Sequence, residues 1–232
     1  AGITIFWLIE NAFPLFKFNY KKWHHAGINF FLTFTTIIVN FCLAFILLKT
    51  ANWCATNHFG ILQWLPKMPN WLYLIIGLAL LDLIGAYLVH LIEHKIKFLW
   101  SFHLIHHSDT WIDTTTANRH HPGESVIRFV FTTLGVLIVG SPMWMVFLYQ
   151  TLSVIATQFN HANISIPKKL DIFLSYFIVS PDMHKVHHHY ILPYTDSNYG
   201  NIFSIWDRLF GTFKVLPREE IVYGVDTHMQ PE

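Results

Sequence analysis

Charged residues are scarce in this chain of 232 residues. Asp, Glu, Lys and Arg together make up 12% of the sequence, against roughly 25% in ordinary soluble domains. Hydrophobic residues reach 53%, and the net charge is only +1. A soluble fold is therefore disfavoured, and no electrostatic feature favours nucleic acid as a partner. The composition indicates a membrane protein.

Cysteine is scarce as well, whereas histidine is abundant. Cys42 and Cys54 are not in a C-x-x-C spacing, so the sequence indicates neither a disulfide framework nor a thiolate metal site. Histidine occurs 16 times, against 15 Lys plus Arg, and most of the histidines lie in tight clusters. Clustered histidine is typical of metal binding.

Long apolar runs predict membrane helices. Residues 27–48 carry no charge and form the clearest span, and residues 70–94 form another. Residues 126–140 and 143–160 are joined by a Ser-Pro turn and predict a helical hairpin. Residues 2–18 are apolar but short, which favours a truncated span or an interfacial helix. The sequence thus predicts an all-α membrane bundle of about four transmembrane helices, hairpin included.

The basic residues predict how the bundle is oriented. Lys21, Lys95 and Lys168 fall on one common side if the spans alternate, and the positive-inside rule places that side in the cytoplasm. Residues 49–69 are expected to form an interfacial connection, and residues 190–232 are expected to cover the cytoplasmic face. Because no repeat or linker is visible, we expect one membrane domain over residues 1–232.

Three histidine boxes have helical spacing. The first, His90-Leu-Ile-Glu-His94, places two imidazoles one turn apart. The pattern H-x-x-H-H then occurs twice, at residues 103–107 and 184–188, and single histidines, His121 and His161, lie at the same expected membrane boundary. One ion takes about four to six ligands, and imidazole suits zinc, copper, iron and nickel. So many histidines on one face predict a centre of two metal ions.

Two other classes of protein share part of this pattern. His90 to His94 also fits H-x-x-E-H, the inverted zinc-protease motif, in which Glu93 would be the general base. A protease of that kind needs one zinc and leaves both H-x-x-H-H boxes without a role. Paired histidines on membrane helices can also ligate haem, which would give a non-catalytic metal or haem carrier. That reading requires facing histidines deep in separate spans.

The three boxes together resemble the fatty acid hydroxylase and sterol desaturase superfamily, over nearly the whole chain. The closing run at residues 195–213 is similar to the branch that contains bacterial sterol-desaturase-like proteins and alkylglycerol monooxygenase. The resemblance implies two iron ions, with zinc as a substitute on isolation, and O2 as co-substrate. It also implies hydroxylation or desaturation of a lipid or sterol-like substrate at a histidine-rich cap that faces the cytoplasm.

The resemblance also implies a set of metal ligands, and no catalytic residue beyond them is singled out. His120 and His189 are left out because relatives often carry other residue types there. A dinucleotide-binding fingerprint is absent, so electrons are expected from a separate redox protein or a reductant such as a pterin. The implied ligands are His90, His94, His103, His106, His107, His121, His161, His184, His187 and His188.

Carboxylates are expected around the ligands, because a metal-bound histidine commonly donates its second N–H to Asp or Glu. Asp82 differs from them because it lies in mid-span, where an ionisable residue is a functional hypothesis by default. We expect Asp82 to orient a ligand or a neighbouring helix. For residues 206–208 the sequence leaves two roles open, which are stabilisation of the cap and contact with the substrate. The candidates next to the boxes are Asp109, Asp113, Glu124, Asp182 and Asp196.

Overall fold

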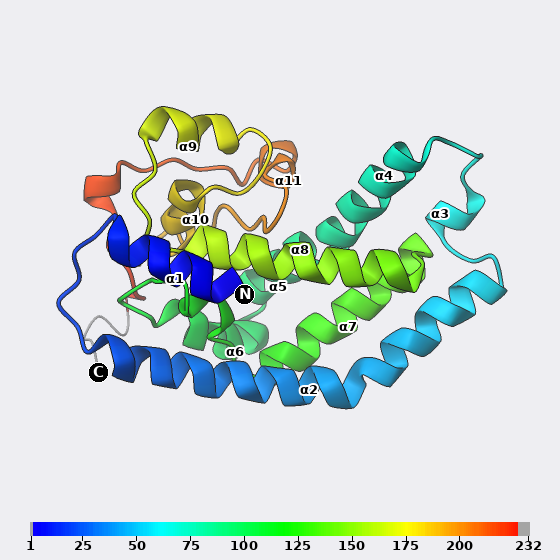
Figure 1. Ribbon diagram of the computed structural model, residues 1–232, viewed down its shortest axis with the longest axis horizontal. Helices are drawn as coiled ribbons and strands as arrows, with labels where there is room; N and C mark the ends of the chain where they lie inside the picture. The colour runs from blue at the N-terminus through cyan, green and yellow to red at the C-terminus, as the bar shows by residue number, and fades with distance from the viewer. Residues whose placement is uncertain (1, 227–232) are drawn as a thin grey trace.

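A computed structural model describes residues 2–226, and their regular structure is helical (Figure 1). Isolated β-bridges are present, but no strand occurs within that range. The all-α prediction is confirmed for the described residues. The last six residues of the expected cap, 227–232, lie outside them.

The longest helix is α2, Lys22–Thr56, which runs along one side of the molecule (Figure 1). It continues eight residues into the connection expected at 49–69, because the first glycine or proline after it is Gly60. The short helix α3, Ile61–Trp64, follows that glycine.

The next long helix is built of three parts that run on without a break. They are α4, Asn70–Asp82, the π-helix η1, Leu83–Leu88, and α5, Val89–Lys95. A π-helical turn contains more residues than an α-turn and is frequent near functional sites. Here it directly precedes the first histidine box.

The predicted hairpin consists of α7, Pro122–Val139, and α8, Met143–His161. Its turn depends on Gly140, which has a left-handed φ of 68°. A Cβ atom on the facing Gly60 would lie 2.4 Å from Gly140 backbone atoms, so the two loops can approach only as glycines. From this turn the two arms diverge, with α7 against α2 and η1, and α8 against α4 (Figure 1).

Three helical segments among residues 2–226 are long and apolar enough to cross a membrane, where about four were predicted. They are Lys22–Trp64, Asn70–Lys95 and Pro122–Val139. The second hairpin arm, α8, is not among them, because polar residues such as Gln150, Ser153 and Thr157 interrupt its apolar sequence. The predicted spans at 27–48 and 70–94 lie inside the first two segments.

The apolar core and the histidines occupy opposite ends of the bundle. Leu81, Val136 and Met145 belong to a buried cluster contributed by α2, α4, α7 and α8. The other end is covered by shorter elements (Figure 1). These are α1 Gly2–Ala12, α6 Lys97–His107, η2 Thr116–Asn118, α9 Lys168–Leu174, α10 Pro181–His187, α11 Ile205–Leu209 and η3 Arg218–Glu220.

Asp82 joins the two ends. Its carboxylate is fully buried and accepts hydrogen bonds from Ile202 N at 3.3 Å, Phe203 N at 3.1 Å and Trp206 Nε1 at 3.1 Å. Asp207 binds the same segment, through Tyr199 N at 2.7 Å. Asp82 therefore orients the segment at residues 199–206. Tyr199 O of that segment lies within hydrogen-bond distance of His90 in the first box.

We expect Asp82→Ala to lower the free energy of unfolding by about 3 kcal/mol, because three hydrogen-bond donors lose a fully buried acceptor. Asp226 is exposed, and Asp226→Ala should change it by less than about 0.5 kcal/mol. Thermal unfolding of the two purified variants in one detergent measures the difference. Equal stability of the two would show that the Asp82 contacts contribute nothing.

Candidate metal centre

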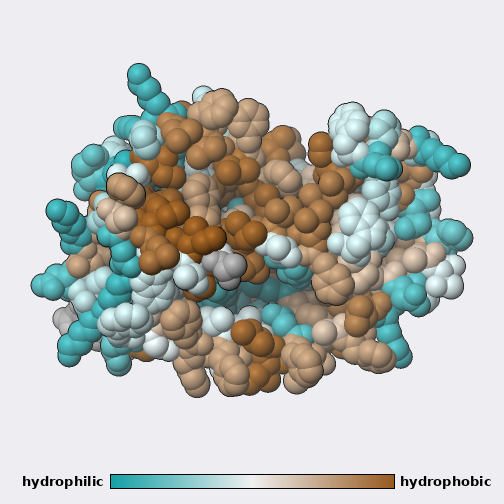
Figure 2. Space-filling model, viewed as in Figure 1, coloured by the Kyte–Doolittle hydropathy of each residue, from teal (hydrophilic) through white to brown (hydrophobic). Residues whose placement is uncertain are grey.

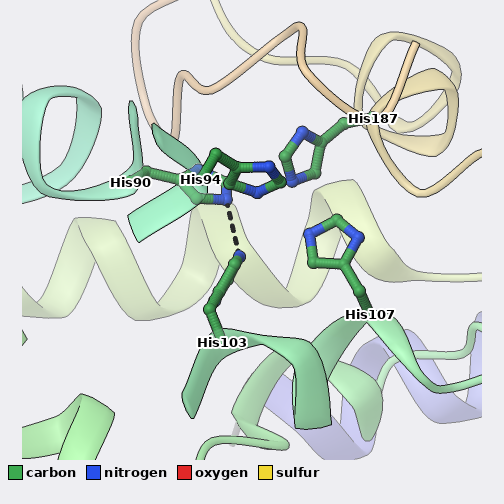
Figure 3. A group of neighbouring side chains, drawn as sticks. All are labelled: His90, His94, His103, His107 and His187. Carbon is green, nitrogen blue, oxygen red and sulfur yellow. Dashed lines mark hydrogen bonds between the residues drawn. The ribbon is translucent and has the colours of Figure 1, made fainter. Parts of the chain in front are cut away.

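Five histidines from three helices form the first group of ligand atoms. One nitrogen from each lies within 4.8 Å of all the others. The rings point toward one another across the space between α5 and α6 (Figure 3). His90 Nε2 is 3.1 Å from His103 Nε2. The group consists of His90, His94, His103, His107 and His187.

Four histidines form a second group beside the first. His161 Nε2 lies 3.1 Å from the Nε2 atoms of His106 and His184 and 3.2 Å from that of His188. The Nε2 atoms of His184 and His188 are 3.2 Å apart. All four residues are buried. Rings from α6, α8 and α10 thus meet at a single point.

Each H-x-x-H-H box is divided between the two groups. In α6 the outer pair, His103 and His107, belongs to the first group, and the middle residue, His106, belongs to the second. In α10 the division is reversed, and the middle residue, His187, belongs to the first group. Residues four apart share a helix face, whereas the residue between them is rotated toward the neighbouring group. The repeated box therefore serves two sites at once.

The backbone fixes the orientation of three rings. His90 Nδ1 lies 2.9 Å from Tyr199 O, and His187 Nδ1 lies 2.6 Å from Ser197 O. In the second group, His161 Nδ1 lies 2.8 Å from Thr157 O. A carbonyl oxygen can only accept, so Nδ1 carries the proton in each neutral ring, and Nε2 presents its lone pair to the group.

Carboxylates fix two further rings of the first group. His103 Nδ1 donates to Glu124 Oε1 at 2.8 Å, and His94 Nδ1 donates to Asp196 Oδ1 at 3.3 Å. The hydrogen bond from His94, together with that from Lys95, lowers the pKa of Asp196 to about 2. Asp196 therefore stays ionised at neutral pH. Glu124 and Asp196 thus accept N–H groups from candidate metal ligands, as predicted from the sequence.

The donor set fits metal ions. Two nitrogens that are each about 2.1 Å from one ion lie roughly 3.0–3.4 Å apart in tetrahedral or octahedral geometry. The contacts of 3.1–3.2 Å fall in that range. His90 and His103 both carry the proton on Nδ1, so their facing Nε2 lone pairs repel without a cation. The buried Nε2 atoms of His94, His107 and His187 also have no hydrogen-bond partner among residues 2–226. A shared cation satisfies all of these atoms.

Burial also keeps the imidazoles of the cap in the form that binds metal. It lowers the pKa of His103 to about 3 and the pKa of His107, His187 and His188 well below the ordinary value. At neutral pH these rings are therefore neutral. Metal ligation requires that state, because a protonated ring has no free lone pair.

An ion-pair network adjoins the first group. Arg128 Nη2 donates to Glu93 Oε2 at 2.6 Å, and Arg128 Nε donates to Glu124 Oε1 at 2.9 Å. Glu124 Oε1 thus receives bonds from Arg128 and His103, and also from His120 Nδ1 at 2.8 Å. The sequence reading did not single out Arg128, although a charged residue inside an apolar span is itself a signal.

The other carboxylates near the boxes serve the scaffold. Asp109 Oδ2 lies 2.8 Å from His25 Nε2, and Asp113 Oδ2 lies 3.3 Å from His25 Nδ1. Burial raises the pKa of Asp109, but the hydrogen bond and charge of His25, the charge of Arg119 and the hydrogen bond from Trp111 N together leave the pKa lowered. Asp182 binds Arg218 Nε at 2.6 Å. These pairs hold the loops that follow and precede the boxes.

Nine of the ten predicted ligands belong to the two groups, and His121 does not. Its Nδ1 accepts from Gly123 N at 3.0 Å and caps the start of α7. His120 hydrogen-bonds to Glu124, and its ring stacks on His106 with centroids 4.9 Å apart. His189, which the sequence reading also left out, accepts from Val222 N at 3.1 Å and lies outside both groups.

Comparison with known proteins identifies the family. A profile described as fatty acid hydroxylase matches residues 71–212, which is more than half of the chain and includes all nine grouped histidines. The chain belongs to the fatty acid hydroxylase family. The resemblance found in the three boxes and the closing run is thereby confirmed.

Individual relatives are named as lipid-oxidising enzymes. The chain is 27% identical to ornithine lipid hydroxylase OlsE of Rhizobium tropici, over 70% of this chain and 46% of the relative. It is 29% identical to alkylglycerol monooxygenase of Danio rerio and 31% identical to that of Homo sapiens, over 74% and 62% of this chain. The matches cover 36% and 31% of those relatives. The chain thus spans less than half the length of each, and no solved structure matches it significantly.

The division of the boxes between two sites predicts the metal content of double variants. His103→Ala with His187→Ala removes ligands from one group only, so about one ion per chain should remain. His103→Ala with His106→Ala, both in one box, removes ligands from both groups and should leave almost none.

Elemental analysis of the iron-reconstituted variants, after correct membrane insertion has been confirmed, measures the difference. The single variant His189→Ala is the control and should retain the metal of the unaltered chain. The reverse ranking of the two double variants would mean that each box serves its own ion.

Proposed function

We propose that this chain is a membrane-bound, non-haem di-iron enzyme that uses O2 to hydroxylate a lipid. The observation that carries the proposal is the pair of buried groups whose histidine Nε2 atoms converge from shared helical boxes. Family membership and the names of the relatives support lipid oxidation, and favour hydroxylation over desaturation.

The nine grouped histidines would hold the two ions, and bound iron would supply the activation of O2. The chain's own residues have three tasks. Tyr199 O, Ser197 O and Thr157 O hold outward N–H groups, so that the lone pairs stay aimed inward. Glu124 and Asp196 add negative charge beside neutral ligands. Burial of the rings limits the access of bulk water to the site.

The geometry disfavours both alternatives drawn from the sequence. In a zinc protease Glu93 would be a free general base, but one of its oxygens is paired with Arg128 at 2.6 Å. The second histidine group would also have no role. A haem would have to lie between its two axial ligands, and nitrogens 3.1 Å apart leave no room for a porphyrin.

The proposal extends to the setting of the enzyme. We propose an integral, multi-pass protein of one domain over residues 1–232, with the histidine site facing the cytoplasm. The three apolar helical segments support insertion, and the basic residues Lys21, Lys95 and Lys168 support the orientation. The reductant is external, either a redox protein or a small molecule such as a pterin.

Cells that express the chain should contain a lipid with one added oxygen atom, and growth under isotopically labelled O2 should label that atom. Lipid extracts analysed by mass spectrometry test this against cells that express His188→Ala, which loses a second-group ligand. Activity should fall by at least about 100-fold in that variant. Unlabelled product oxygen, or equal product from His188→Ala, would contradict an O2-dependent site at these histidines.

A further inference from the structure

A cavity of about 180 Å³ lies between α2, η1, α7 and α8 and extends to both histidine groups. His90 contributes to its wall from the first group, and His106, His161 and His184 contribute from the second. Figure 2 shows a hollow on this face of the molecule, with a hydrophilic floor between hydrophobic rims. The cavity is thus the approach to the metal centre from the side of the bundle.

Polar residues face this cavity from three otherwise apolar helices. On α8, Gln150, Ser153 and Thr157 recur every three or four residues and lead to His161. On α2, Thr36 and Asn40 are one turn apart. Such spacing puts each set on one helix face. On α7 the corresponding residues are Ser125, Arg128 and Thr132.

Polar groups inside a membrane bundle are unfavourable unless they have hydrogen-bond partners. Several are satisfied within the cavity wall: Thr36 Oγ1 lies 2.9 Å from Ser125 Oγ, and Thr157 Oγ1 donates to Asn201 Oδ1 at 2.8 Å. The side-chain amides of Asn40 and Gln150 make no hydrogen bond to another residue in 2–226. These two amides are available to a ligand.

The charges in the wall favour a neutral ligand group. Arg128 lines the cavity, and its charge is balanced by Glu93 and Glu124, at 2.6 and 2.9 Å. An anionic group would have to compete with both carboxylates for Arg128. Hydroxyl and amide groups make up the rest of the polar wall, and these bind uncharged donors and acceptors.

The size of the cavity determines how much of a lipid it can hold. Pockets that enclose a whole drug-sized molecule measure roughly 300–1,000 Å³, and this one is smaller. Asn40 and Val154, at its edge, are both exposed. The same two helices, α2 and α8, also carry exposed apolar side chains, among them Phe41 and Phe147. A polar head group therefore fits inside, while an acyl or alkyl chain extends over the apolar rim.

We propose that the gap between α2 and α8 is a lateral entrance for a single-chain lipid that enters head first. Its uncharged, hydroxyl- or amide-bearing head binds the polar wall at Asn40 and Gln150. The oxidised carbon then lies within a few bonds of the head rather than at the chain end. This inference rests on the proposed lipid oxidation but concerns binding, which can be measured without turnover.

Photo-crosslinking to the metal-loaded protein in nanodiscs, without O2 or reductant so that no turnover occurs, tests the binding mode. Two probes are hexadecylglycerols with a diazirine either beside the ether oxygen or at the chain end. The probe labelled beside the head should modify residues 36–40 and 150–157, and the chain-end probe should modify lipid-facing positions near Phe41 and Phe147. The opposite pattern would overturn head-first entry.

Competition tests the chemistry of the head. Excess unlabelled hexadecylglycerol should suppress the labelling of residues 36–40 and 150–157, whereas hexadecane and hexadecyl phosphate should not. Suppression by hexadecane would show a site for the chain, and equal suppression by hexadecyl phosphate would show that charge is not discriminated. Either result overturns the assignment of a neutral-head subsite.

Variants then assign the subsite to residues. Gln150→Met and Asn40→Leu keep side-chain volume but remove the amide, so each should raise the concentration of hexadecylglycerol needed for suppression about 3–10-fold. Phe34→Leu on α2 and Trp144→Leu on α8, which are exposed and do not line the cavity, are the matched controls and should leave it unchanged. Unchanged suppression in both amide variants would overturn their role.

The binding and oxidation experiments fail independently. Head-first labelling without any O2-derived lipid product would leave the subsite standing and remove the proposed function. Product formation together with labelling of the cavity by the chain-end probe would support the proposed function and overturn the head-first subsite. Folding of each variant is confirmed by its elution as a single species in detergent before labelling.

Discussion

The architecture of the cap depends on the convergence of neutral imidazole lone pairs on two points. The Nε2 lone pairs of His90 and His103, 3.1 Å apart, repel one another unless a cation lies between them. Every outward contact serves this convergence: Tyr199 O, Ser197 O and Glu124 each accept from a ring nitrogen and leave the other nitrogen inward. The scaffold is built to hold rings at fixed orientations rather than to enclose a large core.

Much of the fold and the site could be predicted from local pattern. The spans at 27–48 and 70–94 follow from hydropathy alone, because no other structure satisfies so many consecutive apolar residues in lipid. The histidines of the three boxes follow from helical spacing, since residues four apart necessarily share a face. The carboxylate roles of Glu124 and Asp196 followed from the general need of a metal-bound imidazole for an acceptor.

The remainder depends on how helices are placed against one another, which spacing does not determine. Spacing does not show that the α6 box is divided: α5 brings partners to His103 and His107, whereas α8 brings a partner to His106. His121 was grouped with the ligands by resemblance, whereas a proline and glycine after it begin a helix that uses its ring as a cap. Arg128 and the polar faces of α2 and α8 could be found only from the helical spacing of polar residues within the apolar segments.

The π-helical stretch at Leu83–Leu88 separates two parts of the long helix whose side chains face different partners. Before it, Asp82 faces the segment that contains Ile202 and Phe203, and after it, His90 faces α6. One residue more or less in a helix changes the azimuth of everything beyond it by about 100°. The loss of a single codon in this stretch would therefore leave hydropathy and the histidine spacing intact, yet would turn the first box away from the other two. In this stretch, the geometry of the site constrains how many residues are present more strictly than it constrains which residues they are.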